Sequence, residues 1–184
     1  MKATGIVRRI DELGRVVIPK EIRRTLRIRE GDPLEIFVDR EGGVILKKYS
    51  PIGELSDFAR EYAESIHRSV GHIAAICDMD SVIAVSGSGR KELEGKPLNE
   101  ALEGLITERK VLKAESVNGN QLIPVTAEGS AEVYTAQLVV PIICSGDPIG
   151  AVMLLSKEQG AVISKSDEKV CETAAGFLGR QMET

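Results

Sequence analysis

The first fifty residues are divided by turn-forming residues into segments too short for any one of them to bury a hydrophobic core alone. Residues 5–10 and 15–18 are rich in β-branched side chains, and residues 11–14 (Asp-Glu-Leu-Gly) between them predict a hairpin loop. Pro19 predicts the start of a short helix over residues 20–26, because proline is favoured at a first helical position. Domains of this size commonly need a second chain to bury enough apolar surface, so we expect a tightly paired homodimer.

A second hairpin is expected after this helix. Gly31 and Pro33 break the chain, and apolar residues then recur at every second position over 34–38, which predicts a half-buried strand. Residues 41–43 (Glu-Gly-Gly) predict a turn into a last strand over 44–48. The order expected in this part of the chain is therefore hairpin, helix, hairpin.

Charge is distributed unequally along the chain, although the net charge is only −4. Residues 1–50 contain 12 Lys/Arg and 8 Asp/Glu, whereas residues 51–184 contain 12 Lys/Arg and 20 Asp/Glu. A basic end joined to an acidic remainder is expected when only one end contacts a polyanion. Most of the cations in the basic end are arginine, which suits bidentate contacts with phosphates or with the guanine edge.

Residues 49–53 (Tyr-Ser-Pro-Ile-Gly) have the composition of a linker and coincide with the change of charge sign. We therefore expect a first domain over residues 1–50, a linker over 51–55 and a second domain over 56–184.

Helices are expected at both ends of the second domain. Helical spacing of apolar residues predicts amphipathic helices over about 54–70 and 166–183, with Ser164 or Ser166 as the N-cap of the latter. We expect these two helices to pair between subunits. The strands predicted between them cover residues 73–78, 82–85, 133–143 and 149–155, with 122–125 as a further candidate and a helix over 98–106. Pro141 is expected to interrupt its strand or to mark an edge, and the whole pattern predicts an α+β fold class.

Two strings in the basic end carry a family resemblance. LGRVVIPKEIRR (13–24), followed by GDPLEI (31–36), resembles the AbrB/SpoVT family of swapped-hairpin DNA-binding domains. The resemblance implies a small interleaved β-barrel dimer that binds double-stranded DNA through arginines on its loops and short helix. On this sequence the implied DNA-binding positions are Arg8, Arg9, Arg15, Arg23 and Arg24, with Lys20 as a secondary candidate. Arg27 and Arg29 are assigned to structure or to the rim.

The remainder resembles a GAF domain. The segments that carry this resemblance are ICDMDSVIAVSG (76–87), PIICSGDPIGAVMLLSK (141–157) and ETAAGFLGRQME (172–183). It implies an antiparallel sheet flanked by helices, and GAF domains often bind small molecules such as cyclic nucleotides. Three Phe, three Tyr and no Trp offer little to stack on a purine ring. The ligand-binding residues therefore stay unassigned, and a domain that only dimerises is the rival interpretation.

Together the resemblances imply a cytoplasmic transcription regulator, an activator and repressor of sporulation-stage genes. It would be a homodimer through residues 1–50 and a tetramer through the C-terminal domain. The alternative is an antitoxin-like module that uses the swapped-hairpin fold to dimerise and to bind a protein partner. Antitoxin tails are short and disordered, whereas residues 51–184 have the pattern of a folded domain. A signalling enzyme or second-messenger receptor is a third hypothesis.

Cysteine and histidine spacing argues against metal and disulfide chemistry. Cys77, Cys144 and Cys171 are scattered, which predicts free thiols, and Cys144 beside a turn is the one expected to be exposed. His67 and His72 have no nearby cysteine or carboxylate triad, so we expect neither a metal nor a cofactor. No apolar stretch approaches the roughly 18–20 residues needed to span a bilayer, so no membrane partner is expected.

Catalytic motifs are not expected either, and the chain is interpreted as a non-enzyme. Residues 86–91 (Ser-Gly-Ser-Gly-Arg-Lys) lack P-loop spacing and are interpreted as a surface turn in preference to a phosphate cradle. Asp78 and Asp80 are interpreted as turn formers and not as a catalytic pair.

Overall fold

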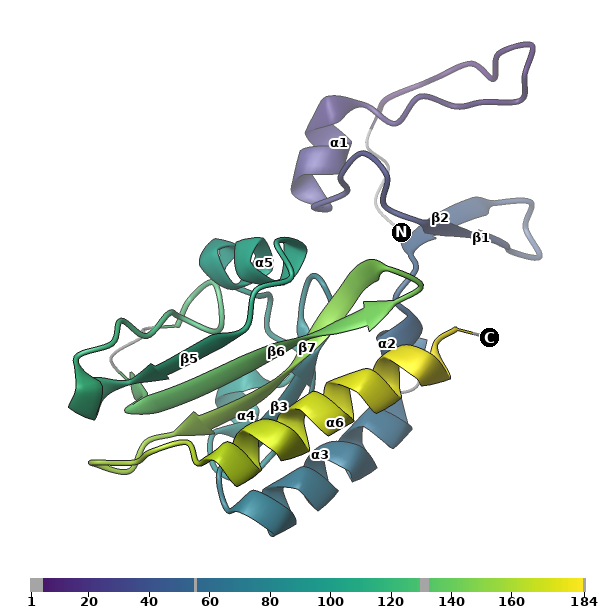
Figure 1. Cartoon of the computed structure of the whole chain (residues 1–184). Helices are drawn as coiled ribbons and strands as arrows, with labels where there is room; N and C mark the ends of the chain where they lie inside the picture. The colour runs from purple at the N-terminus through teal and green to yellow at the C-terminus, as the bar shows by residue number, and fades with distance from the viewer. Residues whose placement is uncertain (1–4, 55, 130–132, 184) are drawn as a thin grey trace. The chain divides into compact units, whose positions relative to one another are not determined.

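The computed structural model describes residues 5–54, 56–129 and 133–183 and divides the chain into two compact units, Met1–Tyr49 and Ser50–Thr184 (Figure 1). The N-terminal unit contains helix α1 (Lys20–Thr25) and strands β1 (Leu34–Val38) and β2 (Val44–Lys48). The two strands form an antiparallel hairpin in which Ile36 faces Leu46. Asp39 closes the hairpin, because its Oδ1 accepts hydrogen bonds from the amides of Glu41 and Gly43.

The first predicted hairpin forms its turn, but the two segments beside the turn do not pair as strands. The amide of Asp11 donates to the carbonyl of Arg15 at 3.0 Å, and Gly14 takes the positive φ of 76° that the turn requires. Residues 5–10 and 15–18 are not strands in the single chain, so that prediction is wrong for it. A two-stranded hairpin is at best marginally stable without a packed face, and these segments have none here.

Helix α1 agrees closely with its prediction, although Pro19 occupies the N-cap and not the first helical position. Pro19 has the extended ψ of 146° that an N-cap requires. Because Pro19 provides no capping side chain, the helix begins without a side-chain cap hydrogen bond.

The C-terminal unit is built on a five-stranded antiparallel sheet in the order β4-β3-β7-β6-β5. Its strands are β3 (Ile73–Cys77), β4 (Val82–Ser86), β5 (Leu112–Glu115), β6 (Ala136–Cys144) and β7 (Asp147–Ser156). Its helices are α2 (Pro51–Glu54), α3 (Ser56–Val70), α4 (Arg90–Leu93), α5 (Glu100–Thr107) and α6 (Lys165–Gln181), and a 3-10 turn, η1, covers Ser116–Asn118.

Both faces of this sheet are covered. Helices α3 and α6 lie side by side on one face, whereas α5 lies on the other (Figure 1). Side chains on alternate positions separate accordingly: Ile76 and Leu154 pack toward α3 and α6, whereas Ala75 and Met153 pack in the cluster that contains residues of α5. The predicted antiparallel sheet flanked by helices is confirmed.

Pro141 does not interrupt β6, contrary to one of the two expectations for it. It pairs with Ala151 of β7, and β5 reaches only as far as Val139 on the other side of β6. The proline therefore lies on a stretch of strand with one neighbour, where a missing amide proton is tolerated.

Residues 122–125 do not form the candidate strand. Instead the fully buried side chain of Gln137 accepts a hydrogen bond from the amide of Ile123 at 3.0 Å and donates one to its carbonyl at 3.2 Å. A side-chain amide thus takes the place of a neighbouring strand and holds this segment against β6.

The last helix begins where a cap was predicted. Ser164, not Ser166, is the N-cap of α6, and its hydroxyl accepts a hydrogen bond from the amide of Asp167 while the Asp167 carboxylate accepts one from Ser164.

Candidate nucleic-acid interface

Arg15 lies at the end of a turn that a single carboxylate organises. Oδ1 of Asp11 accepts hydrogen bonds from the amides of Leu13 and Arg15 at 3.0 and 2.8 Å, and Oδ2 accepts one from Nε of Arg15 at 2.8 Å. The backbone bond from Arg15, followed by its side-chain bond, lowers the pKa of Asp11. The Arg15 side chain remains 70% exposed, so Asp11 holds the guanidinium at its Nε while most of the side chain stays accessible.

Arg8 and Arg9 precede this turn and are both exposed. Arg9 forms no ion pair with the nearby Glu12 or with any other described residue. Both guanidinium groups are therefore available to a ligand outside the chain.

Three further cations share one side of α1. Lys20, Arg23 and Arg24 are separated by three and four positions, which places them on neighbouring sites of one helical face. Lys20 and Arg24 are exposed like charges at i,i+4, an arrangement that costs a helix about 0.2–0.5 kcal/mol. Such a cost is tolerated where a polyanion neutralises the face.

Arg23 differs from its neighbours because its Nε is buried and has no hydrogen-bond partner within the described part of the chain. The neighbouring Glu21 does not pair with it. Buried polar groups in folded proteins nearly always have a partner, so this nitrogen lacks within the described chain the hydrogen bond that it would be expected to make.

Arg27 and Arg29 make structural contacts through their backbone atoms. Arg27 adopts a φ of 52° just after α1, and its carbonyl accepts a hydrogen bond from Nζ of Lys48 at 2.8 Å. The amide of Arg29 donates to the carboxylate of Asp32 at 2.8 Å. These contacts connect the end of α1 to the β1–β2 hairpin.

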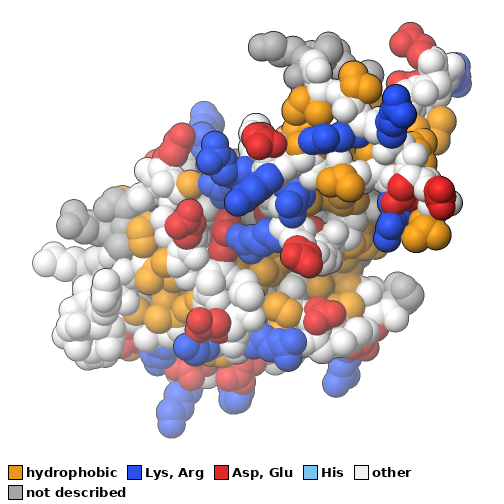
Figure 2. All heavy atoms as spheres, turned by 90° about the horizontal axis from the view of Figure 1, so that it is seen from above, with side chains coloured by type: hydrophobic (Ala, Val, Ile, Leu, Met, Phe, Trp, Pro, Cys, Tyr) orange, Lys and Arg blue, Asp and Glu red, His pale blue; other side chains and the backbone are white. Residues whose placement is uncertain are grey.

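The same unit exposes its apolar side chains. Across residues 5–49 Pro19 is the one buried apolar residue, and Figure 2 shows hydrophobic and cationic side chains intermixed on one face of the molecule. The exposed large hydrophobic residues of this unit are Ile6, Val7, Ile10, Leu13, Val16, Val17, Leu26, Ile36, Phe37, Val38, Val44, Leu46 and Tyr49. A surface of this kind marks an interaction site in a folded protein.

The glycine-rich loop at 86–91 is a turn, as interpreted from the sequence. Gly89 adopts a φ of 83° ahead of the short helix α4, and the guanidinium of Arg90 is paired with Glu94. Asp78 is a turn former too, since its Oδ1 accepts hydrogen bonds from the amides of Asp80 and Ser81.

His67 contacts a backbone carbonyl, with Nδ1 lying 2.7 Å from the carbonyl oxygen of His72. Neither residue belongs to a metal-binding group, and the described residues contain no cluster of His, Cys, Asp and Glu that could hold a metal ion. None of the helices searched in the described chain is both long and apolar enough to cross a membrane.

Comparisons with known proteins give a family match for each of the two units. Residues 54–183 match the family described as "Stage V sporulation protein T C-terminal, transcription factor", and residues 7–54 match "Antidote-toxin recognition MazE, bacterial antitoxin". Stage V sporulation protein T of Bacillus subtilis (strain 168) is 57% identical over 183 residues, covering 100% of this chain and 99% of that protein. The transition state regulatory protein AbrB of the same organism is 64% identical over 63 residues, 31% of this chain and 65% of that protein.

Solved structures define the fold of the larger unit. The GAF domain from an Acinetobacter phosphoenolpyruvate-protein phosphotransferase matches 74% of this chain and 84% of its own, with a TM-score of 0.56 at 12% identity. The second GAF domain of DevS from Mycobacterium smegmatis matches 71% and 93%, with a TM-score of 0.54 at 11% identity. At these identities the likeness shows the fold alone, which is the GAF fold.

A GAF-fold unit joined to an arginine-rich hairpin unit defines a two-part bacterial transcription regulator. The chain belongs to the stage V sporulation protein T family of transcription factors, as the match over its whole length shows. The resemblances to the AbrB/SpoVT and GAF families and the regulator class predicted from the sequence are thereby confirmed.

Proposed function

We propose that the chain binds double-stranded DNA through Arg8, Arg9, Arg15, Lys20, Arg23 and Arg24 of its N-terminal unit. The observation that carries this proposal is a set of four cations, Arg8, Arg9, Lys20 and Arg24, that are exposed and have no ion-pair partner among the described residues. Neutralising phosphates would release counterions, and some of the arginines would contact base edges or a narrowed minor groove. The relative AbrB is described as a transition state regulatory protein, which supports a regulatory role for this unit.

The test is fluorescence anisotropy of the full chain on duplex DNA from its own promoter region, titrated at several salt concentrations. We expect binding that weakens steeply with salt, and a weaker salt dependence when Arg8 or Arg24 is changed to Ala. Each lost phosphate contact removes about 0.9 from the slope of log K against log salt.

Lys110→Ala is the matched control, because Lys110 is an exposed cation outside the N-terminal unit and outside α3 and α6, and it pairs with Glu108. It should leave DNA affinity unchanged. Affinity no higher than for random duplex, together with no effect of the N-terminal substitutions, would contradict the proposal and leave the unit as a dimerisation fold.

Pairing of two chains through the N-terminal unit follows from its exposed apolar side chains. A partner's hairpins would provide the packed face that residues 5–10 and 15–18 lack, and each hydrophobic side chain removed from water contributes about 1.5–3 kcal/mol. Sedimentation equilibrium of the full chain should give no monomer at micromolar concentration. Val17→Asp should weaken this association, because it places a charge in the proposed interface.

Helices α3 and α6 are the proposed second interface, which would produce a tetramer. Phe58, Tyr62 and Phe177 form an aromatic cluster with ring centroids 5.6–6.2 Å apart, and Phe177 is still 41% exposed. Phe177→Asp should convert tetramer to dimer, whereas Val117→Asp, at a 53% exposed position outside both helices, should not. An unchanged assembly in Phe177→Asp would contradict this interface.

We infer further that the regulator acts on sporulation-stage genes as both activator and repressor, in the cytoplasm where the chromosome lies, and has no catalytic activity. The family of the full-length relative supports this inference. Transcript profiling of a deletion strain during sporulation should show genes that rise and genes that fall.

An antitoxin-like role is the alternative, favoured by the family match of residues 7–54. The folded GAF unit with its two hydrophobic clusters argues against it, since antitoxins of this type bind toxins with short disordered tails. Purification from the native cell with a stoichiometric small protein partner, and without DNA affinity, would favour the alternative.

A further inference from the structure

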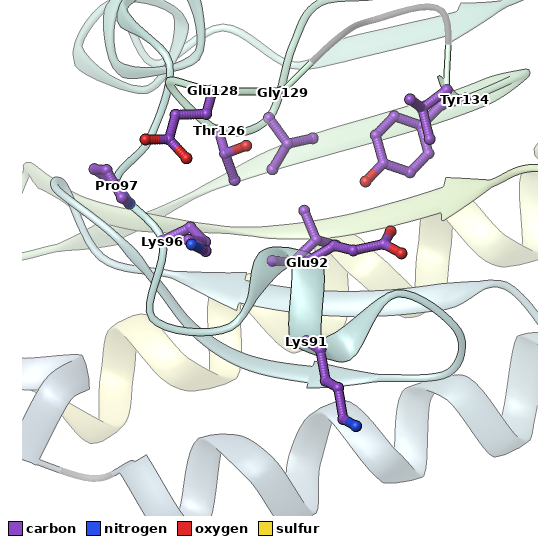
Figure 3. A pocket seen from close by; sticks show the side chains of 11 residues that line it. Lys91, Glu92, Lys96, Pro97, Thr126, Glu128, Gly129 and Tyr134 are labelled. Carbon is purple, nitrogen blue, oxygen red and sulfur yellow. The ribbon is translucent and has the colours of Figure 1, made fainter.

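A cavity of about 350 Å³ opens beside α4 on the face of the GAF sheet opposite α3 and α6 (Figure 3). We call it the α4 pocket, and the residues that matter to its chemistry are Leu93, Lys96, Val125, Thr126, Glu128 and Tyr134. Its volume lies at the lower end of the range for small-molecule sites.

Two buried residues, Thr126 and Tyr134, carry hydroxyl groups at this cavity that have no partner among the described residues. Thr126 is 6% exposed and Tyr134 is 7% exposed, and neither hydroxyl has a hydrogen-bond partner among the residues that the structure describes. Figure 3 shows the Tyr134 hydroxyl directed toward the middle of the cavity. Burial, and then the carboxylate of Glu92, raises the pKa of Tyr134, so its hydroxyl keeps its proton and can donate.

The charged groups at the pocket have two different roles. Glu92 is neutralised by Lys157, whose Nζ lies 2.8 Å from Oε2 of Glu92 and 5.9 Å from the centroid of the Tyr134 ring. Lys96 and Glu128 lie at the other end and have no ion-pair partner among the described residues. Lys91 is directed away from the cavity in Figure 3.

We propose that the α4 pocket binds a free α-amino acid with a small apolar side chain. Lys96 would pair with the ligand's carboxylate and Glu128 with its ammonium group, while the hydroxyls of Thr126 and Tyr134, open to the cavity, would hydrogen-bond to the ligand. Leu93 and Val125, 3% and 1% exposed, give the cavity apolar walls that suit an apolar side chain. The single aromatic side chain at the pocket, Tyr134, is already covered by Lys157, which disfavours a purine nucleotide.

This inference goes beyond the DNA-binding proposal and stands independently of it, because its test measures ligand binding by the full chain without DNA. Isothermal titration with L-valine should give saturable binding at micromolar to millimolar concentration. Isobutylamine and 3-methylbutanoate, which each lack one of the two charged groups, should not bind.

Variants of the pocket should lose this binding. Thr126→Val, Lys96→Met and Glu128→Gln should each weaken L-valine binding at least about fivefold, which corresponds to about 1 kcal/mol. Thr126→Val should not lower the unfolding midpoint of the free protein, because the removed hydroxyl has no partner there. Matched controls on exposed positions outside the pocket are Thr107→Val, Lys110→Met and Glu61→Gln, which should bind normally.

Three results would overturn the proposal. The first is that none of L-alanine, L-valine and L-methionine binds. The second is that all three pocket variants still bind L-valine normally. The third is that cyclic AMP binds and the amino acids do not. Loss of DNA binding alone would not affect it, so the two proposals fail by different measurements.

Discussion

The hydroxyl of Ser50 donates a hydrogen bond of 2.8 Å to Oδ2 of Asp78, which joins the first residue of the C-terminal unit to the turn between β3 and β4. The other carboxylate oxygen of Asp78 accepts from the amides of Asp80 and Ser81 at 2.8 and 2.7 Å. Asp78 is 7% exposed, so one buried side chain holds both the start of the unit and the turn.

Asp78→Ala should therefore lower the free energy of unfolding of the GAF unit by about 2–3 kcal/mol, because it leaves buried donors without an acceptor. Urea denaturation followed by circular dichroism measures this loss. Asp57→Ala is the control, since that side chain is 93% exposed and should change stability by no more than about 0.5 kcal/mol. If the two substitutions changed the free energy of unfolding equally, the Asp78 hydrogen bonds would contribute little to the stability of the unit.

Gly179→Ala should destabilise the protein strongly, by about 2 kcal/mol or more, because overpacking shifts the backbone. A Cβ at this position would lie 2.1 Å from the carbonyl oxygen of Ile143, where α6 crosses β6. Gly176→Ala in the same helix is a matched control with open space around it, and it should stabilise by about 0.5–1 kcal/mol. Thermal unfolding of the two variants should give midpoints shifted in opposite directions.

Acid should loosen the Asp11 turn. Because hydrogen bonds from Arg15 lower the pKa of Asp11, the turn's stabilisation is present above the unfolded-state pKa of this carboxyl and is lost as pH falls through its folded-state pKa. Carboxyl NMR should find Asp11 titrating below an ordinary aspartate. Arg15→Ala should raise this pKa only part of the way, because the backbone bond is the larger cause, and Arg8→Ala should not change it.

Thiol reagents should distinguish Cys144 from the other cysteines. Cys77 and Cys171 are buried, which raises the pKa of both thiols, that of Cys171 to about 12. Cys144 is half-buried, with Sγ 3.2 Å from the carbonyl of Met182. An aromatic disulfide reagent should therefore label only Cys144 in the native protein and all three thiols in denaturant. Cys144→Ser should abolish native labelling, and rapid reaction of three thiols would contradict the burial of the other two.

Local sequence signals predicted much of the secondary structure. Alternation over residues 34–38 predicted β1 with its bounds, and Ser164 was one of two caps predicted for α6, because both signals involve residues within one turn or one strand. The candidate DNA-binding arginines also came from local strings, and all of them except the half-buried Arg23 are exposed. The residues of the α4 pocket were not predicted, since no motif joins Lys96 to Thr126 or Tyr134.

By itself the sequence determined the turn at residues 11–14, the serine cap of α6, the alternation of β1 and the net positive charge of the first fifty residues. Only the tertiary structure decided that Gln137 replaces a strand partner for Ile123, and that Glu115 accepts the amide of Ile163, 48 residues away, at 2.8 Å. Only the tertiary structure showed that residues 5–10 and 15–18 do not pair as strands within a single chain. The physical reason is that a buried polar side chain takes its hydrogen bonds from whichever groups the folded sheet brings near it. In the same way, a marginally stable hairpin needs a packed face that another part of the structure, or a second chain, provides.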